Sequence, residues 1–256
     1  MNKKALLSLS VSTGAYNEFV DRIIALAYEQ KYRYVCVANV HMLIETYFNP
    51  EFAAVVNDAD VISPDGKPLT WALRLFYNVR QDRVAGMDLL PDLLQQAESK
   101  RLPVYFYGGT NALLSQTKEF VTTRYPSLHI AGLYSPPFRT ITLEEEQVIV
   151  QRINDSGARL VFVVLGCPKQ EKWIVGMKGR INAVMIGVGG ALPVLAGMQK
   201  RAPSWMQQAG FEWLFRLSQE PKRLFKRYAV TNTLFIYLLT KELIKMRLLR
   251  KKPAVV

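Results

Sequence analysis

The sequence is poor in the residues that carry disulfide and metal chemistry. Its 256 residues include only two cysteines, Cys36 and Cys167, and only two histidines, His41 and His129. Both cysteines lie within or just after apolar runs, where a thiol usually behaves as a small buried hydrophobe, so a disulfide is not expected. Neither histidine has a cysteine or carboxylate at metal-ligand spacing, which argues against a zinc site. We therefore expect no bound metal.

Long apolar runs are also missing. The most membrane-like stretch, residues 228–240, is interrupted by polar side chains at 231–233, whereas a membrane-spanning helix needs about 20 apolar residues. Polar residues soon follow Lys3 and Lys4, so no signal peptide is indicated. These absences predict a cytoplasmic protein that at most lies on the surface of a bilayer.

Two common nucleotide-binding motifs are absent. No GxxxxGK[ST] phosphate loop occurs, so an ATPase is disfavoured. Residues 187–190 do not begin a dinucleotide motif GxGxxG, because Leu192 occupies the place of its last glycine. Asp58-Ala59-Asp60 has the form of a metal-binding DxD motif, but it lies between the end of a predicted helix and the start of a predicted strand. We expect no metal there.

Positive charge is concentrated at the C-terminal end. The chain carries a net charge of +12, and residues 200–256 hold thirteen lysines and arginines against three acidic residues. Apolar side chains lie between them, including Trp213, Phe215, Leu224, Phe225, Tyr228, Phe235 and Tyr237. This mixture suits a surface or ligand that is both anionic and apolar. A helix lying on a membrane and a helix packed on its own domain with a solvated basic face both fit this pattern.

Short runs rich in β-branched and aromatic residues alternate with helical patterns up to about residue 188. The predicted strands cover residues 34–38, 60–62, 104–107, 129–132, 160–165 and 183–188. The predicted helices cover residues 15–30, 41–48, 50–59, 88–100, 111–124, 143–156 and 168–177, and another begins near Pro68. This alternation is typical of an α/β, Rossmann-like domain with a mostly parallel sheet flanked by helices. Ligands of such domains bind beyond the carboxyl ends of the strands.

The pattern changes at Ala202-Pro203, after which no β-type run recurs. Residues 204–218 and 221–249 predict two helices that meet at Glu220-Pro221, because proline restricts the residue before it. We therefore divide the chain into a Rossmann-like domain, residues 1–199, and a basic helical appendage, residues 200–256.

A sharp turn, Ser63-Pro64-Asp65-Gly66, follows the second predicted strand. Pro64 fixes φ and Gly66 permits positive φ, so the turn presents Asp65 at the carboxyl end of a strand. A carboxylate there could act as a base. The simpler interpretation of these residues alone is an Asp-Gly turn whose aspartate caps the turn or the next helix. Asn39, after the first strand, could likewise bind a substrate hydroxyl or carbonyl or cap the helix at 41–48.

Glycines follow three other predicted strands and precede helices. They are Gly108 and Gly109, then Gly166, then Gly187, Gly189 and Gly190. Such glycines let backbone amides at helix N-termini approach a phosphate. Each turn alone is a weak signal, but together they predict a nucleotide pocket.

Taken in order, these motifs resemble one family closely. The resemblance is carried by residues 38–43 (ANVHML), 60–66 (DVISPDG), 83–89 (RVAGMDL), 107–109, 166–171 (GCPKQE), 187–190, 201–203, 210–213, 216 and 220–228. The chain is similar, over nearly its whole length, to the WecG/TagA/CpsF glycosyltransferases, also called glycosyltransferase family 26.

This resemblance implies an inverting hexosyltransferase that moves a sugar from a UDP-sugar to a polyprenyl-diphosphate-linked saccharide, without a metal or other cofactor. It implies a peripheral enzyme at the inner face of the cytoplasmic membrane that serves bacterial surface polysaccharide or exopolysaccharide synthesis. By the same resemblance Asp65 is the general base, the six glycines above hold UDP, and the appendage meets the membrane and the acceptor. The substrate-binding residues would be Asn39, Arg83, Gln170, Arg216, Arg223 and Arg227.

Two positions depart from the family pattern. Val37 stands where members often carry threonine, so any contact made by that hydroxyl is in doubt here. Lys226 stands where an arginine is expected, which keeps the charge but loses the bidentate fork.

Two other functions are alternatives. A nucleic-acid-binding module would use the basic end but would not need the turn at Asp65. A nucleotide-sugar oxidoreductase or epimerase would need the dinucleotide motif that is missing. We expect no nucleic-acid partner. The residues do not indicate the donor sugar, the acceptor saccharide or the pathway, and they are compatible with a homo-oligomer.

Overall fold

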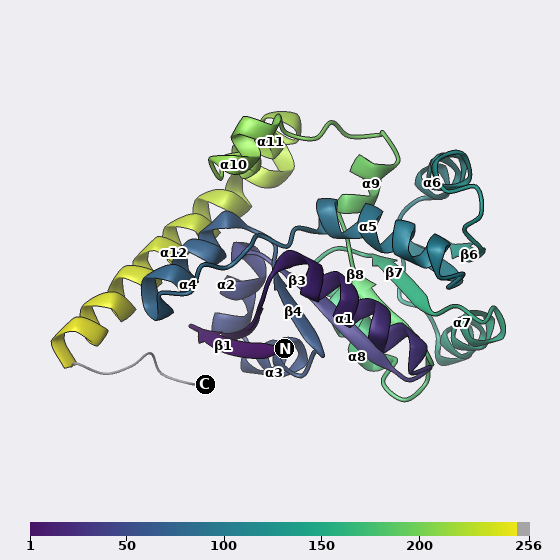
Figure 1. Ribbon diagram of the computed structural model, residues 1–256, viewed down its shortest axis with the longest axis horizontal. Coiled ribbons are helices and arrows are strands. Elements are labelled where there is room, and N and C mark those ends of the chain that lie inside the picture. The colour runs from purple at the N-terminus through teal and green to yellow at the C-terminus, as the bar shows by residue number, and fades with distance from the viewer. Residues whose placement is uncertain (250–256) are drawn as a thin grey trace.

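The computed structural model describes residues 1–249 and contains a six-stranded parallel sheet (Figure 1). The strand order is β4-β3-β8-β7-β5-β6. The strands are β3 (Arg33–Ala38), β4 (Val61–Pro64), β5 (Val104–Gly108), β6 (Ile130–Tyr134), β7 (Leu160–Val164) and β8 (Val184–Gly187). All six predicted strands and the α/β class are confirmed. The basic residues Arg250, Lys251 and Lys252 of the predicted appendage lie outside the described residues.

Alternate residues of the strands point to opposite faces of the sheet and build two cores. Tyr34 and Cys36 belong to one core, and Val35 and Val37 to the other. The first core is covered by α2 (Val40–Phe48), α3 (Pro50–Asn57), α4 (Lys67–Tyr77), α7 (Leu143–Asp155) and α8 (Lys169–Gly176). The second is covered by α1 (Tyr16–Tyr28), α5 (Gly86–Ser99), α6 (Asn111–Arg124) and α9 (Ala191–Leu195). Burial of both faces explains why the strands read as continuous apolar runs.

An antiparallel hairpin, β1 (Asn2–Leu6) and β2 (Leu9–Thr13), opens the chain, and nothing in the sequence pattern indicates it. It lies beside the edge strand β4, where the hydroxyl of Ser12 accepts a 3.0 Å hydrogen bond from the amide of Ile62. The hydroxyl of Tyr77 donates to the carbonyl of Ala5 at 2.5 Å. The hairpin therefore covers a sheet edge that would otherwise be exposed.

The prediction of one helix over residues 204–218 is wrong. The structure has two short helices there, α10 (Ser204–Gln208) and α11 (Glu212–Gln219). The break falls at Gly210, whose φ of +79° ends the first helix, and the ring of Trp71 lies where a side chain at this position would be. This turn brings α11 back over the carboxyl ends of the strands. The short helix α9 is also absent from the sequence prediction.

The last helix, α12 (Pro221–Leu249), packs against α2 and α11 (Figure 1). Its inner side buries Leu224, Thr231, Phe235 and Leu238, and the last two join the sheet core. Its outer side exposes Phe225, Ile236 and Tyr237 beside several lysines. Within residues 1–249, no helix is long and apolar enough to cross a membrane. The domain division at residue 200 stays a prediction.

Candidate active site

A cavity of about 240 Å³ lies at the carboxyl ends of β3, β4 and β8. The turns that follow these strands line one side, and α11 and α12 line the other. The helix α12 can close this side because it packs on α2, which itself begins directly after β3. The cavity therefore occupies the edge of the sheet where the α/β topology predicts ligand binding.

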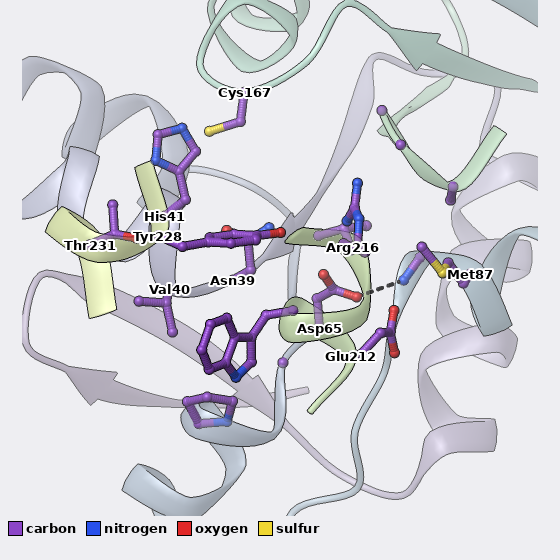
Figure 2. A pocket seen from close by; sticks show the side chains of 18 of the residues that line it. Asn39, Val40, His41, Asp65, Met87, Cys167, Glu212, Arg216, Tyr228 and Thr231 are labelled. Atoms are coloured by element: carbon purple, nitrogen blue, oxygen red, sulfur yellow. Dashed lines mark hydrogen bonds between the residues drawn. The ribbon is translucent and has the colours of Figure 1, made fainter. Parts of the chain in front are cut away.

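Asp65 lies in the cavity wall, in the turn that the sequence predicts after β4. Its backbone amide donates to the carbonyl of Ala38 at 2.8 Å, and its Oδ1 accepts from the amide of Gly86 at 3.0 Å. Helix α4 begins at Lys67 with no side-chain cap, so Asp65 does not cap it. Within the described residues the other carboxylate oxygen has no hydrogen bond, and Figure 2 shows this side chain beside Glu212 and Arg216.

Burial raises the pKa of Asp65 to about 6, and the negative charge of Glu212 adds to this increase. The hydrogen bond from Gly86 and the positive charges of Arg83 and Arg216 act in the opposite direction. A carboxylate with a pKa near 6 is still ionised at neutral pH and accepts a proton more readily than an exposed aspartate does. The geometry is thus that of a general base.

Asn39 combines both roles that the sequence left open. Its Oδ1 accepts a 3.1 Å hydrogen bond from the amide of Met42 and so caps α2. The residue also lines the cavity, on the same side as Asp65 (Figure 2). The cap fixes the orientation of the amide group, whose nitrogen has no hydrogen bond within residues 1–249 and can donate to a ligand.

Three arginines of the C-terminal helices reach the cavity. Arg216 comes from α11, whereas Arg223 and Arg227 come from the first two turns of α12. Arg216 lies against Gly190 so closely that a side chain at that glycine would meet its guanidinium at 2.5 Å. Among the residues that the structure describes, the Nε of Arg227 is buried without a hydrogen-bond partner, and burial lowers the pKa of this side chain, as do the charges of Arg223 and Arg216. Arg223 also pairs with Glu220 and is 59% exposed, so the buried Nε of Arg227 is the strongest sign that this side of the cavity suits an anion.

Of the predicted glycines, Gly166, Gly187, Gly189 and Gly190 line the cavity. The side chain of Gln170 lies where a side chain at Gly187 would be, 2.6 Å from that position. Gln170 itself is buried, accepts from the amide of Gly166 at 3.1 Å and donates to Glu171 at 2.8 Å. Its amide therefore joins two of the glycine turns.

Gly108 and Gly109 do not line the cavity. Both have positive φ, and a side chain at Gly108 would meet the carbonyl oxygen of Val164 at 2.6 Å. Close packing of β5 on β7 is sufficient to require glycine there. The structure gives the predicted nucleotide contact at these two residues no support.

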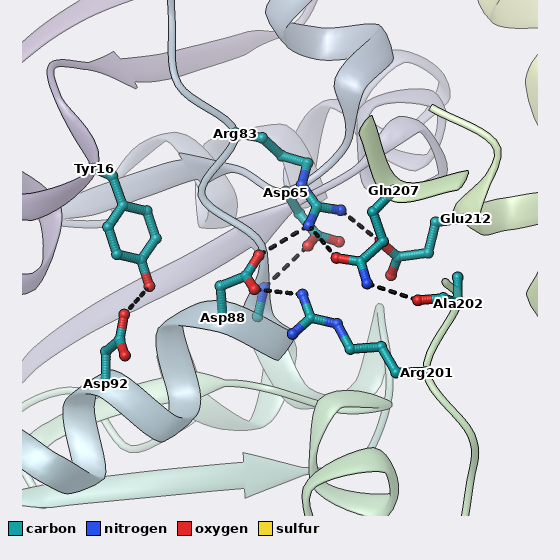
Figure 3. Close-up of polar contacts among 10 residues, drawn as sticks. Tyr16, Asp65, Arg83, Asp88, Asp92, Arg201, Ala202, Gln207 and Glu212 are labelled. Carbon is teal, nitrogen blue, oxygen red and sulfur yellow. Dashed lines mark hydrogen bonds and ion pairs between the residues drawn. The ribbon is translucent and has the colours of Figure 1, made fainter. Parts of the chain in front are cut away.

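Arg83 lines the cavity, but its guanidinium is directed at carboxylates of the protein. One terminal nitrogen pairs with Glu212 at 2.5 Å, and the other pairs with Asp88 at 2.9 Å (Figure 3). Asp88 also pairs with Arg201. These contacts join the start of α5 to α11 and to the segment that leads into it. Arg83 therefore connects the sheet side of the cavity to its helical side.

Several lining residues belong to the motifs of the family resemblance but were not predicted to be site residues. His41, Trp213, Tyr228 and Glu212 are brought to the cavity by the packing of α2, α11 and α12. Burial and the nearby charge of Arg227 lower the pKa of His41, which favours the neutral imidazole. The rings of Trp213 and Tyr228 meet edge to face with centroids 5.9 Å apart. Only a fold that places residue 228 beside residue 41 could identify this group.

Within residues 1–249, no three His, Cys, Asp or Glu side chains gather into a metal-binding group. Asp60 of the DxD sequence accepts from the amide of Tyr34 at 3.0 Å, and Asp58 pairs with Lys178 at 3.0 Å. Both aspartates precede β4 and lie outside the cavity lining.

The fold and the cavity together place a carboxylate and three arginines at the strand ends of an α/β sheet, where ligands of such folds bind. Comparison with known families is more specific. Residues 4–249 match the family described as "Glycosyl transferase WecG/TagA/CpsF family", and the chain belongs to this family of glycosyltransferases. The family resemblance recognised in the sequence is thereby confirmed. Membership favours a transferase over a nucleic-acid-binding module or an oxidoreductase.

Two curated relatives are named N-acetylglucosaminyldiphosphoundecaprenol N-acetyl-beta-D-mannosaminyltransferase. The protein of Bacillus spizizenii is 32% identical over 225 residues, which cover 87% of this chain and 86% of the relative. The protein of Bacillus subtilis is 33% identical over 187 residues, which cover 71% of each.

Proposed function

We propose that this glycosyltransferase moves N-acetylmannosamine from its UDP derivative to an N-acetylglucosaminyl-diphosphate carried by a polyprenyl lipid. The acceptor and the sugar are those in the names of the two relatives. The UDP carrier is an inference from the family resemblance and from the glycine turns at Gly166 and residues 187–190. No metal or other cofactor takes part in the proposed reaction.

The observation that carries this proposal is Asp65 in a cavity that three arginines share. As a hydroxyl oxygen of the acceptor attacks the anomeric carbon of the donor, the free oxygen of Asp65 takes its proton. The bond between that carbon and the diphosphate breaks, and the electron pair leaves with UDP. Arg216, Arg223 and Arg227 offset the charge that develops on this leaving group. A single displacement inverts the anomeric centre, in keeping with the β-linked product in the relatives' names.

Exchange of Asp65 for asparagine tests the base. Asp65→Asn keeps the shape of the side chain but accepts no proton, so transfer should fall by about 100- to 10,000-fold while UDP binding persists. The measurement is sugar transfer to a short-chain lipid-diphosphate-N-acetylglucosamine, with UDP binding followed by calorimetry. Asp58→Asn, at an exposed ion pair outside the cavity, is the matched control. Full activity of Asp65→Asn would refute the assignment.

We also propose that the enzyme works as a peripheral protein at the inner face of the cytoplasmic membrane. The outer side of α12 exposes Phe225, Ile236 and Tyr237, and Lys222, Lys226 and Lys241 lie among them. Aromatic and aliphatic side chains can enter the headgroup region while the lysines meet anionic lipid. The arginine side of the cavity would then open toward the layer that contains the acceptor.

A further inference from the structure

A network of charged side chains connects the C-terminal helices to the sheet domain beside the proposed base. The guanidinium of Arg83 pairs with Glu212 on α11 at 2.5 Å and with Asp88 on α5 at 2.9 Å (Figure 3). Arg201 pairs with the second oxygen of Asp88. The amide of Gln207 donates to the carbonyl of Ala202 at 2.7 Å and thereby closes the turn between these charges. We call this group of charges the Arg83 network.

Within the Arg83 network, the pair of Arg83 and Glu212 is largely shielded from water, whereas Asp88 and Arg201 are each 32% exposed. The side chains of Arg83 and Glu212 are 13% and 18% exposed. A partly buried guanidinium with two carboxylate partners is far more costly to leave unpaired than a surface ion pair. The network therefore fixes the position of α11 on the sheet domain.

Glu212 has two consequences for the cavity. Arg216 follows it by one helical turn, so both project from the same side of α11. The pairing of Glu212 with Arg83 thus places the guanidinium of Arg216 against Gly190 in the cavity wall. Glu212 is also the only carboxylate that raises the proton affinity of Asp65 among the charged groups facing it in the described residues.

We propose that Glu212 is a positioning residue of the transferase: through Arg83 it holds Arg216 in the cavity, and its negative charge faces Asp65. The proposal rests on Asp65 being the general base. It assigns Arg83 to this support rather than to the substrate. It also makes the activity of the base depend on the docking of α11.

The charged groups around Asp65 determine in which direction a substitution of Glu212 shifts the pKa of Asp65. Glu212 raises the pKa of Asp65, whereas Arg83, Arg216 and the amide of Gly86 lower it. The base works only when ionised, so kcat/KM rises with pH through the pKa of Asp65 in the free enzyme. Loss of the Glu212 charge lowers that pKa and moves the acid limb of the profile to lower pH. Both substrates are diphosphate diesters, which do not titrate in this range.

The experiment compares two variants of the full chain. Glu212→Gln removes the charge beside Asp65, whereas Asp88→Asn loosens the same network on the side away from the base. We expect the acid limb of kcat/KM to shift down by about half a pH unit in Glu212→Gln and to stay in place in Asp88→Asn. We also expect Glu212→Gln to lose about tenfold in kcat/KM at pH 8. In Glu212→Asp, which keeps the negative charge, the acid limb of kcat/KM should return to its wild-type position. Thermal melting of each variant verifies folding.

An acid limb that stays in place in Glu212→Gln would overturn the proposal, as would an equal shift in both variants. The failure of this proposal is distinct from the failure of the proposed function. If Asp65→Asn is inactive and Glu212→Gln keeps the wild-type limb, Asp65 is the base and Glu212 does not act on it. If Asp65→Asn is active, the base assignment itself fails.

Discussion

The two sides of the cavity are held in different ways. On the sheet side, Asp65 is fixed by the backbone, through the carbonyl of Ala38 and the amide of Gly86. On the helical side, Arg216 depends on the pairing of Glu212 with Arg83. Backbone contacts between neighbouring strands persist as long as the sheet persists, whereas side-chain pairs between remote segments can be lost alone. The base therefore belongs to the stable part of the molecule, and the cations belong to a part that can be loosened separately.

The largest expected effect concerns the sheet itself. Phe162 is fully buried and stacks on Phe106 with centroids 5.4 Å apart. Phe162→Ala should lower the free energy of unfolding by about 3–5 kcal/mol, because it leaves a cavity in the core. Phe225→Ala, on the exposed side of α12, should change it by less than about 0.5 kcal/mol. Urea unfolding measures both, and equal losses would contradict the contrast between the two regions.

The next effect isolates the helical side. Arg227→Ala should lower kcat/KM by about 100-fold, because a half-buried cation at the proposed site of the leaving diphosphate is lost, and Arg227→Lys should recover only part of it. Urea unfolding should change little. Lys118→Ala, exposed on α6 away from the cavity, is the control. The measurement is the steady-state rate of sugar transfer. Wild-type activity in Arg227→Ala would show that this arginine does not contribute to the reaction.

A smaller effect is expected where the two sides touch. A methyl group added at Gly190 would meet the guanidinium of Arg216, so Gly190→Ala should displace it and lower kcat/KM by about tenfold. Gly176→Ala adds the same group in open space in α8 and should leave activity unchanged. If the two variants behave alike in transfer assays, Arg216 does not need its present position.

The smallest effect concerns the membrane. The double variant Phe225→Ser and Ile236→Ser removes two exposed apolar side chains from α12 and should weaken binding to anionic vesicles several-fold. Transfer to a water-soluble acceptor should not change. Co-sedimentation with vesicles at low and high salt measures the binding. Unchanged sedimentation would show that this side of α12 is not the membrane contact.

The sheet could be predicted because its strands, apart from the partly exposed edge strand β6, are buried on both faces and read as apolar runs. Asp65 could be located because Pro64 and Gly66 mark a turn at the end of such a run. The hairpin at the N-terminus escaped prediction, since its strands are short and contain lysine and serine. The helix predicted over residues 204–218 was wrong, because Gly210 breaks it to let α11 fold back. Local patterns indicate elements but not where a chain reverses.

The roles of Arg83 and of the glycines illustrate the same limit. The family pattern marked Arg83, Gly108 and Gly190 equally. The structure places Arg83 between two carboxylates, Gly108 against the backbone carbonyl of Val164, and Gly190 against the guanidinium of Arg216 in the cavity. A motif identifies a residue, whereas its neighbours in space determine what it contacts.

By itself, the sequence determined the six strands of the parallel sheet and most of the helices between them, the turn that presents Asp65, and the family, because these depend on residues close together in the chain or on an ordered set of motifs. Only the tertiary structure decided which charges surround Asp65. Glu212 and Arg83 are separated by 129 positions, and the pKa of about 6 for Asp65 arises from burial and from such neighbours. Burial and Coulomb interactions depend on distance in space, which the linear sequence does not contain.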